Sequence, residues 1–264
     1  MVDILMILVN FILAMIAWKA LHLTRNGALV AGVVGGLIWY GGGFYAWSLL
    51  GLFFISSSFW SNYKEERKYH LNQVHEKGSQ RDAWQVLANG GIAAFCCLGY
   101  RLTESPSFLI ATAVSIAAST ADTWASEIGV LSSKPPRSIL TMKAIPTGLS
   151  GGVSLLGTLS QIIGAALIAS YATSYLIVFY RFPFNSIELV GLIAGLGILG
   201  SIIDSLFGVL LQAKYECLVC HLKTEKTVHH DVQTKLIGGV SWLTNDQVNL
   251  ISNLIVTVLA LLSY

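Results

Sequence analysis

Residues 107–129 read SFLIATAVSIAASTADTWASEIG, and this stretch decides both the fold class and the place of the chemistry. Its first half is a continuous apolar run, which is typical of a helix that crosses a membrane. Its last third carries Asp122 and Glu127 at the end of that helix. Ionisable side chains next to lipid are costly and are rarely present without a partner, a water-filled cavity or a function. The stretch therefore predicts a membrane helix with a functional acidic end.

The composition of the 264-residue chain excludes an ordinary soluble domain. Hydrophobic residues make up 54% and charged residues only 11%, against about 25% charged residues in soluble domains. The mean hydropathy is +0.66, and apolar runs recur along the whole chain. We predict an all-α, polytopic transmembrane helix bundle that forms a single domain, 1–264. The net charge of +2 says little about partners, because the distribution of charge matters more than its sum.

About eight apolar stretches are long enough to cross a membrane, which takes roughly 17 to 25 residues. Their approximate bounds are 4–21, 27–42, 44–60, 83–100, 106–121, 152–179, 187–211 and 246–263. The second is short and glycine-rich, and the acidic motif cuts the fifth short. The first has no basic stretch before it and no small-residue cleavage site after it, so we expect a retained helix rather than a signal peptide.

Basic residues predict the orientation, because they concentrate in cytoplasmic loops. With the N-terminus and C-terminus outside, all of the 16 Lys and Arg residues except Arg101 and Arg181 fall on the cytoplasmic side. Dropping one span would scatter them over both faces. The predicted cytoplasmic loops cover about 61–82, 122–151 and 212–245. We expect an integral membrane protein of a bacterial plasma membrane.

The polar motifs fall on the same cytoplasmic side. They are KGSQRDAWQVLANGG at 77–91, ADTWASEIG at 121–129, KAIPTGLSGGVS at 143–154, SIIDSLFG at 201–208 and WLTNDQVN at 242–249. Asp122-Thr123 and Asp204-Ser205 form a weak internal repeat: each pair lies near the inner end of a predicted helix, and the two helices run in the same direction. A parallel duplication would produce such a repeat. The chemistry of the protein is therefore expected to face the cytoplasm.

Four carboxylates are predicted at one membrane depth: Asp122, Glu127, Asp204 and Asp246. Such groups repel one another unless cations hold them, and Mg²⁺ takes one or two carboxylates together with substrate phosphates. The alternative is that each is a solvated or capping residue at a helix end, and Asp246 could be the N-cap of the last span.

Two glycine-rich stretches, PTGLSGGVS at 146–154 and LIGGVSW at 236–242, each approach a predicted helix. Backbone amides and the positive end of a helix can hold a phosphate. Lys143 precedes the first stretch, whereas neither stretch matches a P-loop or a dinucleotide fingerprint. Turns and packing sites are the alternative reading, so the case for phosphate depends on the nearby lysine and carboxylates.

The cysteines form two pairs, Cys96 with Cys97 in an apolar run and Cys217 with Cys220 in a polar loop, and neither suggests a secreted disulfide scaffold. The loop also contains His221, His229 and His230, so the two cysteines and two of the histidines, with His229 and His230 as the candidate pair, could hold a structural Zn²⁺. The alternative is a reduced loop without metal.

The motifs RDAWQVLANGG, ADTWASEIG, PTGLSGGVSLLGT, DSLFGVLLQ, CLVC and GGVSWLTNDQVN span residues 81–249 in one order. In this the chain resembles the membrane family that includes transmembrane protein nineteen and the phytyl-phosphate kinase of chloroplasts. The resemblance implies a prenyl-phosphate kinase that transfers a phosphoryl group from ATP or CTP, with Mg²⁺, to a prenyl monophosphate. His230 departs from the family pattern, which has a cysteine there.

We assign the candidate residues to four roles. The metal-bridging set is Asp122, Glu127, Asp204 and Asp246; the direct phosphate contacts are Lys143 and Arg81; the backbone and hydroxyl contacts are Thr123, Ser150, Gly151, Gly152 and Ser205; the orienting amides are Asn89, Asn245 and Asn249. The expected partners are a membrane lipid and a nucleotide, with no nucleic acid, and a homodimer stays open.

Two other functions compete with the kinase. A nucleotidyltransferase that acts on a lipid phosphate needs the same metal and charges. A transporter or flippase for phosphorylated lipids also uses intramembrane acids and glycine-interrupted helices. Alternating access requires groups reachable from both faces, whereas nearly every polar motif here lies on one side.

Overall fold

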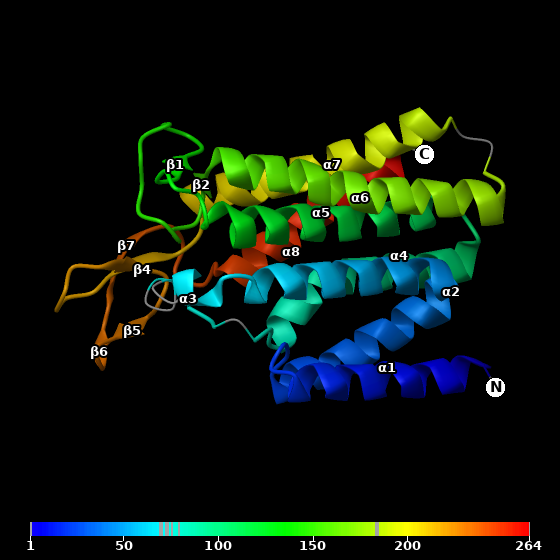
Figure 1. Cartoon of the computed structure of the whole chain (residues 1–264), viewed down its shortest axis with the longest axis horizontal. Helices are drawn as coiled ribbons and strands as arrows, with labels where there is room; N and C mark the ends of the chain where they lie inside the picture. Colours follow the sequence, from blue (N-terminus) through cyan, green and yellow to red (C-terminus); the bar gives the residue numbers. More distant parts are fainter. Residues whose placement is uncertain are drawn as a thin grey trace.

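The computed structural model describes residues 2–68, 71, 74, 76–78, 80–182 and 185–263. Its helices are α1 (Val2–Lys19), α2 (Arg25–Asn62), α3 (Glu65–Lys68), α4 (Ala83–Thr103), α5 (Pro106–Gly129), α6 (Leu155–Tyr180), α7 (Ser186–Leu210) and α8 (Asn245–Leu262). Within these described residues, seven helices are long and apolar enough to cross a membrane, and α3 is a single short turn. The predicted all-α, polytopic helical membrane protein is confirmed (Figure 1).

The longest helix, α2, is a hairpin of two spans. A straight helix of 38 residues would measure about 57 Å, well beyond the roughly 30 Å of bilayer hydrocarbon. Gly43 interrupts it with φ 60° and ψ −155°, a conformation that glycine adopts readily because it has no Cβ. Asn62 at the far end lies 3.3 Å from the ring of His22, which precedes the helix, so the chain folds back on itself. The two arms match the second and third predicted spans, so the seven long helices of the described residues make eight passes through the bundle.

The helices of the bundle pack around α5, which contacts α2, α4, α6, α7 and α8. Every residue from Leu109 to Ala121 is buried. A Cβ added to Gly197 or Gly200 of α7 would lie within 3 Å of the Cβ of Ala117 or Ala118. Small residues on both helices therefore let their backbones approach closely, as in other membrane bundles.

Polar side chains begin several of the helices. Thr24, Asp82 and Ser154 each accept a hydrogen bond from a backbone N–H in the first turn of α2, α4 and α6. At α4, the side chain of Gln85 accepts a hydrogen bond from the backbone of Asp82 in return, which completes a capping box. The helix starts are thus set by local sequence.

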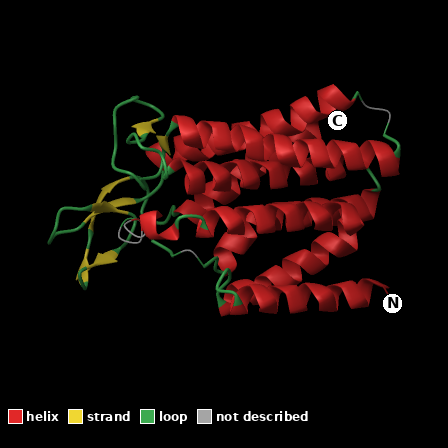
Figure 2. Cartoon of the chain, in the orientation of Figure 1, coloured by secondary structure: helices red, strands yellow, loops and turns green. Residues whose placement is uncertain are grey.

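The strands are short and gather at one end of the bundle, away from both termini (Figures 1 and 2). They are β1 (Arg137–Ser138), β2 (Gly152–Val153), β3 (Lys214–Glu216), β4 (Lys223–Thr224), β5 (Val228–His229), β6 (Val232–Gln233) and β7 (Lys235–Gly238). Strands β4, β3 and β7 form an antiparallel sheet in that order, and β1 with β2 and β5 with β6 form antiparallel pairs. The predicted loop 212–245 is therefore a small folded unit.

Some predicted boundaries were wrong at this end of the bundle. Helix α5 continues to Gly129 rather than ending near residue 121, so Asp122 and Glu127 lie within its last turns and not in a loop. Helix α6 begins at Leu155, after the glycine-rich turn. Both termini lie at the opposite end from the strands, as an even number of crossings requires (Figure 1).

Candidate functional site

A cavity of about 320 Å³ lies at the end of the bundle next to the strands. Helices α2, α3, α4, α5, α7 and α8 contribute to its wall, together with the loops before α4 and α6 and the turn after β4. The predicted residues that line it are Arg81, Asn89, Asp122, Thr123, Glu127, Ser150, Gly151, Asp204, Ser205, Asn245, Asp246 and Asn249. The structure thus brings most of the predicted site into one place.

Two predicted residues do not line this cavity. Lys143 is exposed, and its carbonyl oxygen accepts a hydrogen bond from Ser138 N–H at 2.9 Å, which holds it in the β1 turn. A Cβ added to Gly152 would lie 3.1 Å from Ile145 Cδ1 and 3.3 Å from Pro136 Cβ, so this residue faces those side chains. The prediction that Lys143 contacts the same phosphate as the carboxylates is therefore not supported by its place, and Lys68 and Lys77 line the cavity instead.

Asp122 and Asp204 line the cavity from α5 and α7. Ser201 Oγ donates to Asp122 Oδ1 at 3.3 Å, and Ser252 Oγ donates to Asp204 Oδ2 at 3.3 Å. The Asn249 amide nitrogen, turned toward the carboxylate, also donates to Asp204. In the described part of the chain neither carboxylate forms an ion pair. Both residues are half-buried, and carboxylates removed from part of their water are stabilised by a cation or a proton.

Glu127 is already paired with a lysine. Its Oε2 lies 2.7 Å from Lys68 Nζ, and its Oε1 accepts a hydrogen bond from Ser61 Oγ at 2.8 Å. Lys68 is only 8% exposed, and it also donates to the carbonyl oxygen of Trp60 at 2.6 Å. The pair ties α5 to α3, and the hydrogen bonds of Ser61 and Trp60 connect it to the end of α2, so a metal at Glu127 would have to compete with Lys68.

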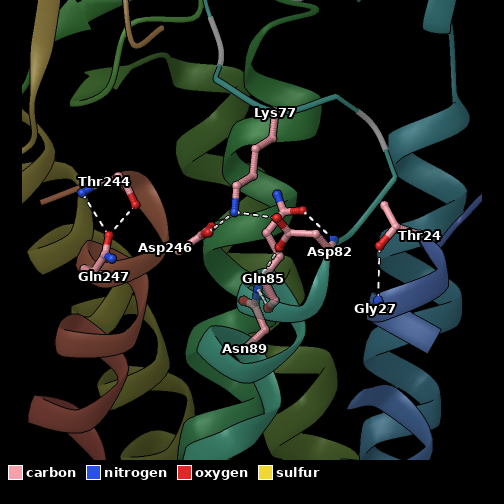
Figure 3. A network of polar contacts seen from close by, with 9 residues as sticks. All are labelled: Thr24, Gly27, Lys77, Asp82, Gln85, Asn89, Thr244, Asp246 and Gln247. Carbon is pink, nitrogen blue, oxygen red and sulfur yellow. Dashed lines mark hydrogen bonds and ion pairs between the residues drawn. The ribbon is translucent and has the colours of Figure 1, made fainter. Parts of the chain in front are cut away.

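Asp246 is also paired, and it is not the cap of its helix. Lys77 Nζ bridges Asp246 at the start of α8 and Asp82 at the start of α4, where the distance to Asp82 is 2.6 Å (Figure 3). Burial alone would lower the pKa of Lys77, but its hydrogen bonds to the two carboxylates raise it overall. Burial likewise raises the pKa of Asp82, but the contacts with Lys77 and Gln85 lower it overall. The N-cap of α8 is Thr244.

Arg81 offers a guanidinium group with unused donors. Its Nη1 donates to Ser58 Oγ at 3.2 Å, whereas its Nη2 is buried and has no hydrogen-bond partner among the residues that the structure describes. The group lies over the rings of Phe53 and Phe54, at 5.7 and 5.5 Å. Burial lowers the pKa of Arg81, yet a guanidinium starts so high that it stays charged. Arg81 can therefore bind an anion through an N–H group that none of the described residues accepts from.

A second cavity of about 140 Å³ lies between α1, α2 and α4 and shares Arg81, Gln85 and Asn89 with the first. The rest of its wall is mainly apolar, including Leu13, Ala17, Val34, Leu50, Phe53, Phe54 and Val86. An apolar pocket thus adjoins the charged cavity at Arg81.

The glycine-rich turn before α6 is pressed against α7. Gly151 has φ 80°, and a Cβ there would lie 2.0 Å from Val209 Cγ2 and 2.8 Å from Ser205 O. Ser150 in the same turn donates a hydrogen bond to Glu225. The first amides of α6 are capped by Ser154, whose Oγ accepts from Gly157 N–H at 3.1 Å. Any phosphate contact in this region would therefore come from the turn rather than from the helix end.

The four residues of the predicted zinc set also meet. The ligand atoms of Cys217, Cys220, His229 and His230 all lie within 4.8 Å of one another. The backbone N–H of Cys220 is the main cause that lowers the pKa of the Cys217 thiol to about 6. This cluster lies in the β3–β6 region, and its residues are not part of the cavity wall.

Several residues of the cavity were not predicted, among them Lys68, Lys77, Gln85 and Glu225. Lys68 and Lys77 belong to the charged stretch that precedes α4. Lys77 pairs with Asp246, which is 169 residues away along the chain, and Lys68 pairs with Glu127, which is 59 residues away. A single sequence carries no signal for such distant pairs. Only their position between two predicted spans on the cytoplasmic side could have suggested a role.

Fold and site together define a polytopic helical membrane protein with a charged cavity at one end of its bundle. The chain belongs to the family described as integral membrane protein DUF92, whose model matches residues 8–257. Protein PGR of Arabidopsis thaliana is 29% identical over 279 residues, which cover 96% of this chain and 93% of that protein. An uncharacterized membrane protein of Methanocaldococcus jannaschii is 33% identical over 212 residues, covering 79% and 82% of the two chains. No solved structure matches the chain significantly.

Proposed function

We propose that this protein is a membrane-embedded kinase that transfers a phosphoryl group from a nucleoside triphosphate to a prenyl monophosphate. The product is the prenyl diphosphate. The observation that carries the proposal is one cavity that combines the buried Nη2 of Arg81 with two carboxylates, Asp122 and Asp204, which form no ion pair among the described residues. The resemblance to phytyl-phosphate kinases agrees with this reading, and the host membrane, predicted to be a bacterial plasma membrane, stays a prediction.

The residues of the cavity fit a divalent cation. Oxygen atoms of Asp122 and Asp204, with nearby Ser201, Ser252 and Asn249, form the hard oxygen donor set that Mg²⁺ prefers. Mg²⁺ bound there would neutralise charge on the phosphates of the nucleotide. Glu127 and Asp246 are held by lysines, so we assign them to positioning those lysines rather than to the metal.

The reaction needs little covalent help from the protein. An oxygen of the lipid monophosphate, already ionised, forms a bond to the terminal phosphorus of the nucleotide. The bond from that phosphorus to its bridging oxygen breaks, and the nucleoside diphosphate leaves with the electron pair. No proton has to be removed from the nucleophile. Arg81 and the two cavity lysines would stabilise negative charge on the transferring group.

The apolar pocket accounts for the prenyl chain. It meets the charged cavity at Arg81, Gln85 and Asn89, so a lipid phosphate bound at Arg81 would have its first apolar carbons between α1, α2 and α4. Burial of each CH₂ group in such a pocket contributes about 0.8 kcal/mol. This arrangement favours a lipid over a small soluble phosphate as the acceptor.

The test is turnover by purified protein with a panel of prenyl monophosphates, ATP or CTP, and Mg²⁺, read by the mass of the lipid product. We expect Asp122→Asn and Asp204→Asn each to lose about a hundredfold or more of the rate while the protein stays folded in detergent. Glu188→Gln is the matched control, because Glu188 is exposed at the other end of α7.

Each outcome has a distinct meaning. A diphosphate product that depends on both aspartates supports the kinase, whereas full activity in both variants contradicts the metal role. A lipid carrying a nucleotide would assign the protein to the nucleotidyltransferases. An absence of turnover, together with movement of phosphorylated lipid across sealed vesicles, would instead indicate a transporter.

A further inference from the structure

We propose that Cys217, Cys220, His229 and His230 bind one structural Zn²⁺, which holds the β3–β7 segment against the charged cavity. The metal site is independent of the proposed kinase activity, since none of its four residues lines that cavity. It concerns the part of the chain that the proposed reaction leaves unexplained.

The ligand set has the composition and the spacing of a tetrahedral zinc site. With Zn–S near 2.3 Å and Zn–N near 2.0 Å, neighbouring ligand atoms around the metal lie about 3.3 to 3.8 Å apart. The four ligand atoms lie within 4.8 Å of one another, and Cys220 Sγ is 3.7 Å from His229 Nδ1. Small side-chain movements would therefore complete the coordination. Two thiolates and two imidazoles are typical of structural zinc sites.

The backbone already presents both sulfur atoms. Cys217 and Cys220 lie on the tight turn between β3 and β4, which is closed by hydrogen bonds from Cys217 N–H to Leu222 O and from His221 N–H to Cys217 O. Val219 N–H is directed at Cys217 Sγ at 3.4 Å. Such N–H groups stabilise negative charge on a sulfur that binds a metal.

The histidines come from the neighbouring hairpin. His229 ends β5, and His230 follows it in the turn to β6 with φ 54°. Asp231 next to it also has a positive φ, which is uncommon for residues other than glycine. The turn therefore directs two consecutive rings toward the cysteines at the expense of backbone strain.

The segment has little else to hold it together. Its strands have two to four residues, and several of its large apolar side chains are exposed, namely Leu218, Val219, Val228, Val232, Leu236 and Ile237. Units shorter than about 40 residues usually need a disulfide or a metal, because they cannot bury enough apolar surface. The cysteines are free thiols, so a metal is the remaining cross-link between the two hairpins.

The cross-link would position a wall of the cavity. Glu225 follows β4, lines the cavity, and accepts a hydrogen bond from Ser150. Its N–H and the Thr224 hydroxyl both donate to the carbonyl oxygen of Val74, each at 2.8 Å. Val74 lies three residues before Lys77, so the zinc segment also holds the chain from which Lys77 reaches into the cavity.

The test measures the metal directly in the full-length protein, purified without chelator from zinc-supplied cells and with its affinity tag removed. We expect about one zinc ion per chain by elemental analysis. Replacement by Co²⁺ should give the visible bands of a tetrahedral site and a thiolate charge-transfer band.

The variants separate ligation from folding. Cys220→Ser and His230→Asn change exposed side chains, and we expect each to lower zinc affinity at least about tenfold. His221→Asn is the control, because His221 lies in the same turn but contacts Glu216 instead, and it should keep the metal. A wild-type protein with less than about a tenth of a zinc per chain, or a Cys220→Ser variant with unchanged Co²⁺ spectra, would overturn the site. Bound zinc without kinase turnover would overturn only the proposed function.

Discussion

At the scale of single residues, the carboxylates of the cavity fall into two kinds. Glu127 and Asp246 have lysine partners, whereas among the described residues Asp122 and Asp204 accept hydrogen bonds from hydroxyl and amide donors and form no ion pair. The sequence predicted all four residues and their common place, because each lies near the predicted cytoplasmic end of an apolar span. The sequence could not separate the paired carboxylates from the others, because the pairing depends on Lys68 and Lys77, whose partners lie far away along the chain.

Arg81 gives the sharpest prediction at this scale. Its buried Nη2 has no partner in the described chain, so Arg81→Gln should weaken binding of a phosphate analogue about tenfold or more. Arg81→Lys should recover only part of this, since an ammonium group cannot reproduce the planar fork. Binding of inorganic pyrophosphate with Mg²⁺, followed by calorimetry, measures the effect.

The control for Arg81 is Arg101→Gln. Arg101 is exposed at the opposite end of α4 and stacks on Tyr40, so its replacement should leave the affinity unchanged. Equal losses of affinity in Arg81→Gln and Arg101→Gln would show that the effect comes from the net charge of the protein and not from a contact of Arg81.

At the scale of elements, the sequence located the membrane spans better than the segments between them. The break of α2 at Gly43 agrees with the separation of the predicted spans 27–42 and 44–60, since glycines and apolar length mark such a turn. The strands of 212–245 were not predicted, because strands of two to four residues carry no readable alternation. The end of α5 was placed too early because its last turns are polar, although they line a cavity and not lipid.

Gly43 provides a stability test of the hairpin. A Cβ at this position meets no atom within 4 Å, so the cost of Gly43→Ala comes from its positive φ alone, about 1 to 3 kcal/mol. Gly51→Ala lies in the second arm, also in open space and with helical backbone, and it should be neutral or stabilise by about 0.5 to 1 kcal/mol. The Tm values of Gly43→Ala and Gly51→Ala are compared by thermal unfolding in detergent. Equal Tm values would contradict the hairpin turn at Gly43.

The Lys77 bridge between α4 and α8 predicts a pH dependence. The folded pKa of Asp82 is lowered, so its contribution to stability is present above the unfolded value of about 3.9 and is lost as the pH falls through the lower folded value. The folded pKa of Lys77 is raised, so its contribution is present below about 10.4 and is lost as the pH rises through the higher folded value.

We therefore expect the Tm of Asp82→Asn to fall less steeply than that of the wild type as the pH drops below about 4. Likewise, the Tm of Lys77→Met should fall less steeply than that of the wild type as the pH rises above about 10.5. Asp3→Asn, at the far end of α1, serves as a control for the acid limb. Acid curves of equal slope for wild type and Asp82→Asn would show that the bridge does not contribute.

At the scale of the whole molecule, both termini lie at one end of the helix bundle and the strands next to the charged cavity lie at the other (Figure 1). The distribution of Lys and Arg predicts that the cavity side is cytoplasmic. In intact spheroplasts, protease added to the medium should cut a site introduced at either terminus. A site inserted in the β5–β6 turn should be cut only after the spheroplasts are lysed. Cleavage of the turn in intact cells would reverse the orientation.

The central position of α5 has a consequence for biogenesis. This helix turns few side chains toward lipid, and its buried face includes Thr112, Ser115, Ser119 and Thr120. When it leaves the ribosome it lacks α6, α7 and α8, which later surround it. Its hydroxyl groups then meet either hydrocarbon or the insertion machinery. Stable residence of this helix in the bilayer must therefore wait for the C-terminal half of the chain, and nascent chains that stop after residue 130 should be substrates for membrane quality control.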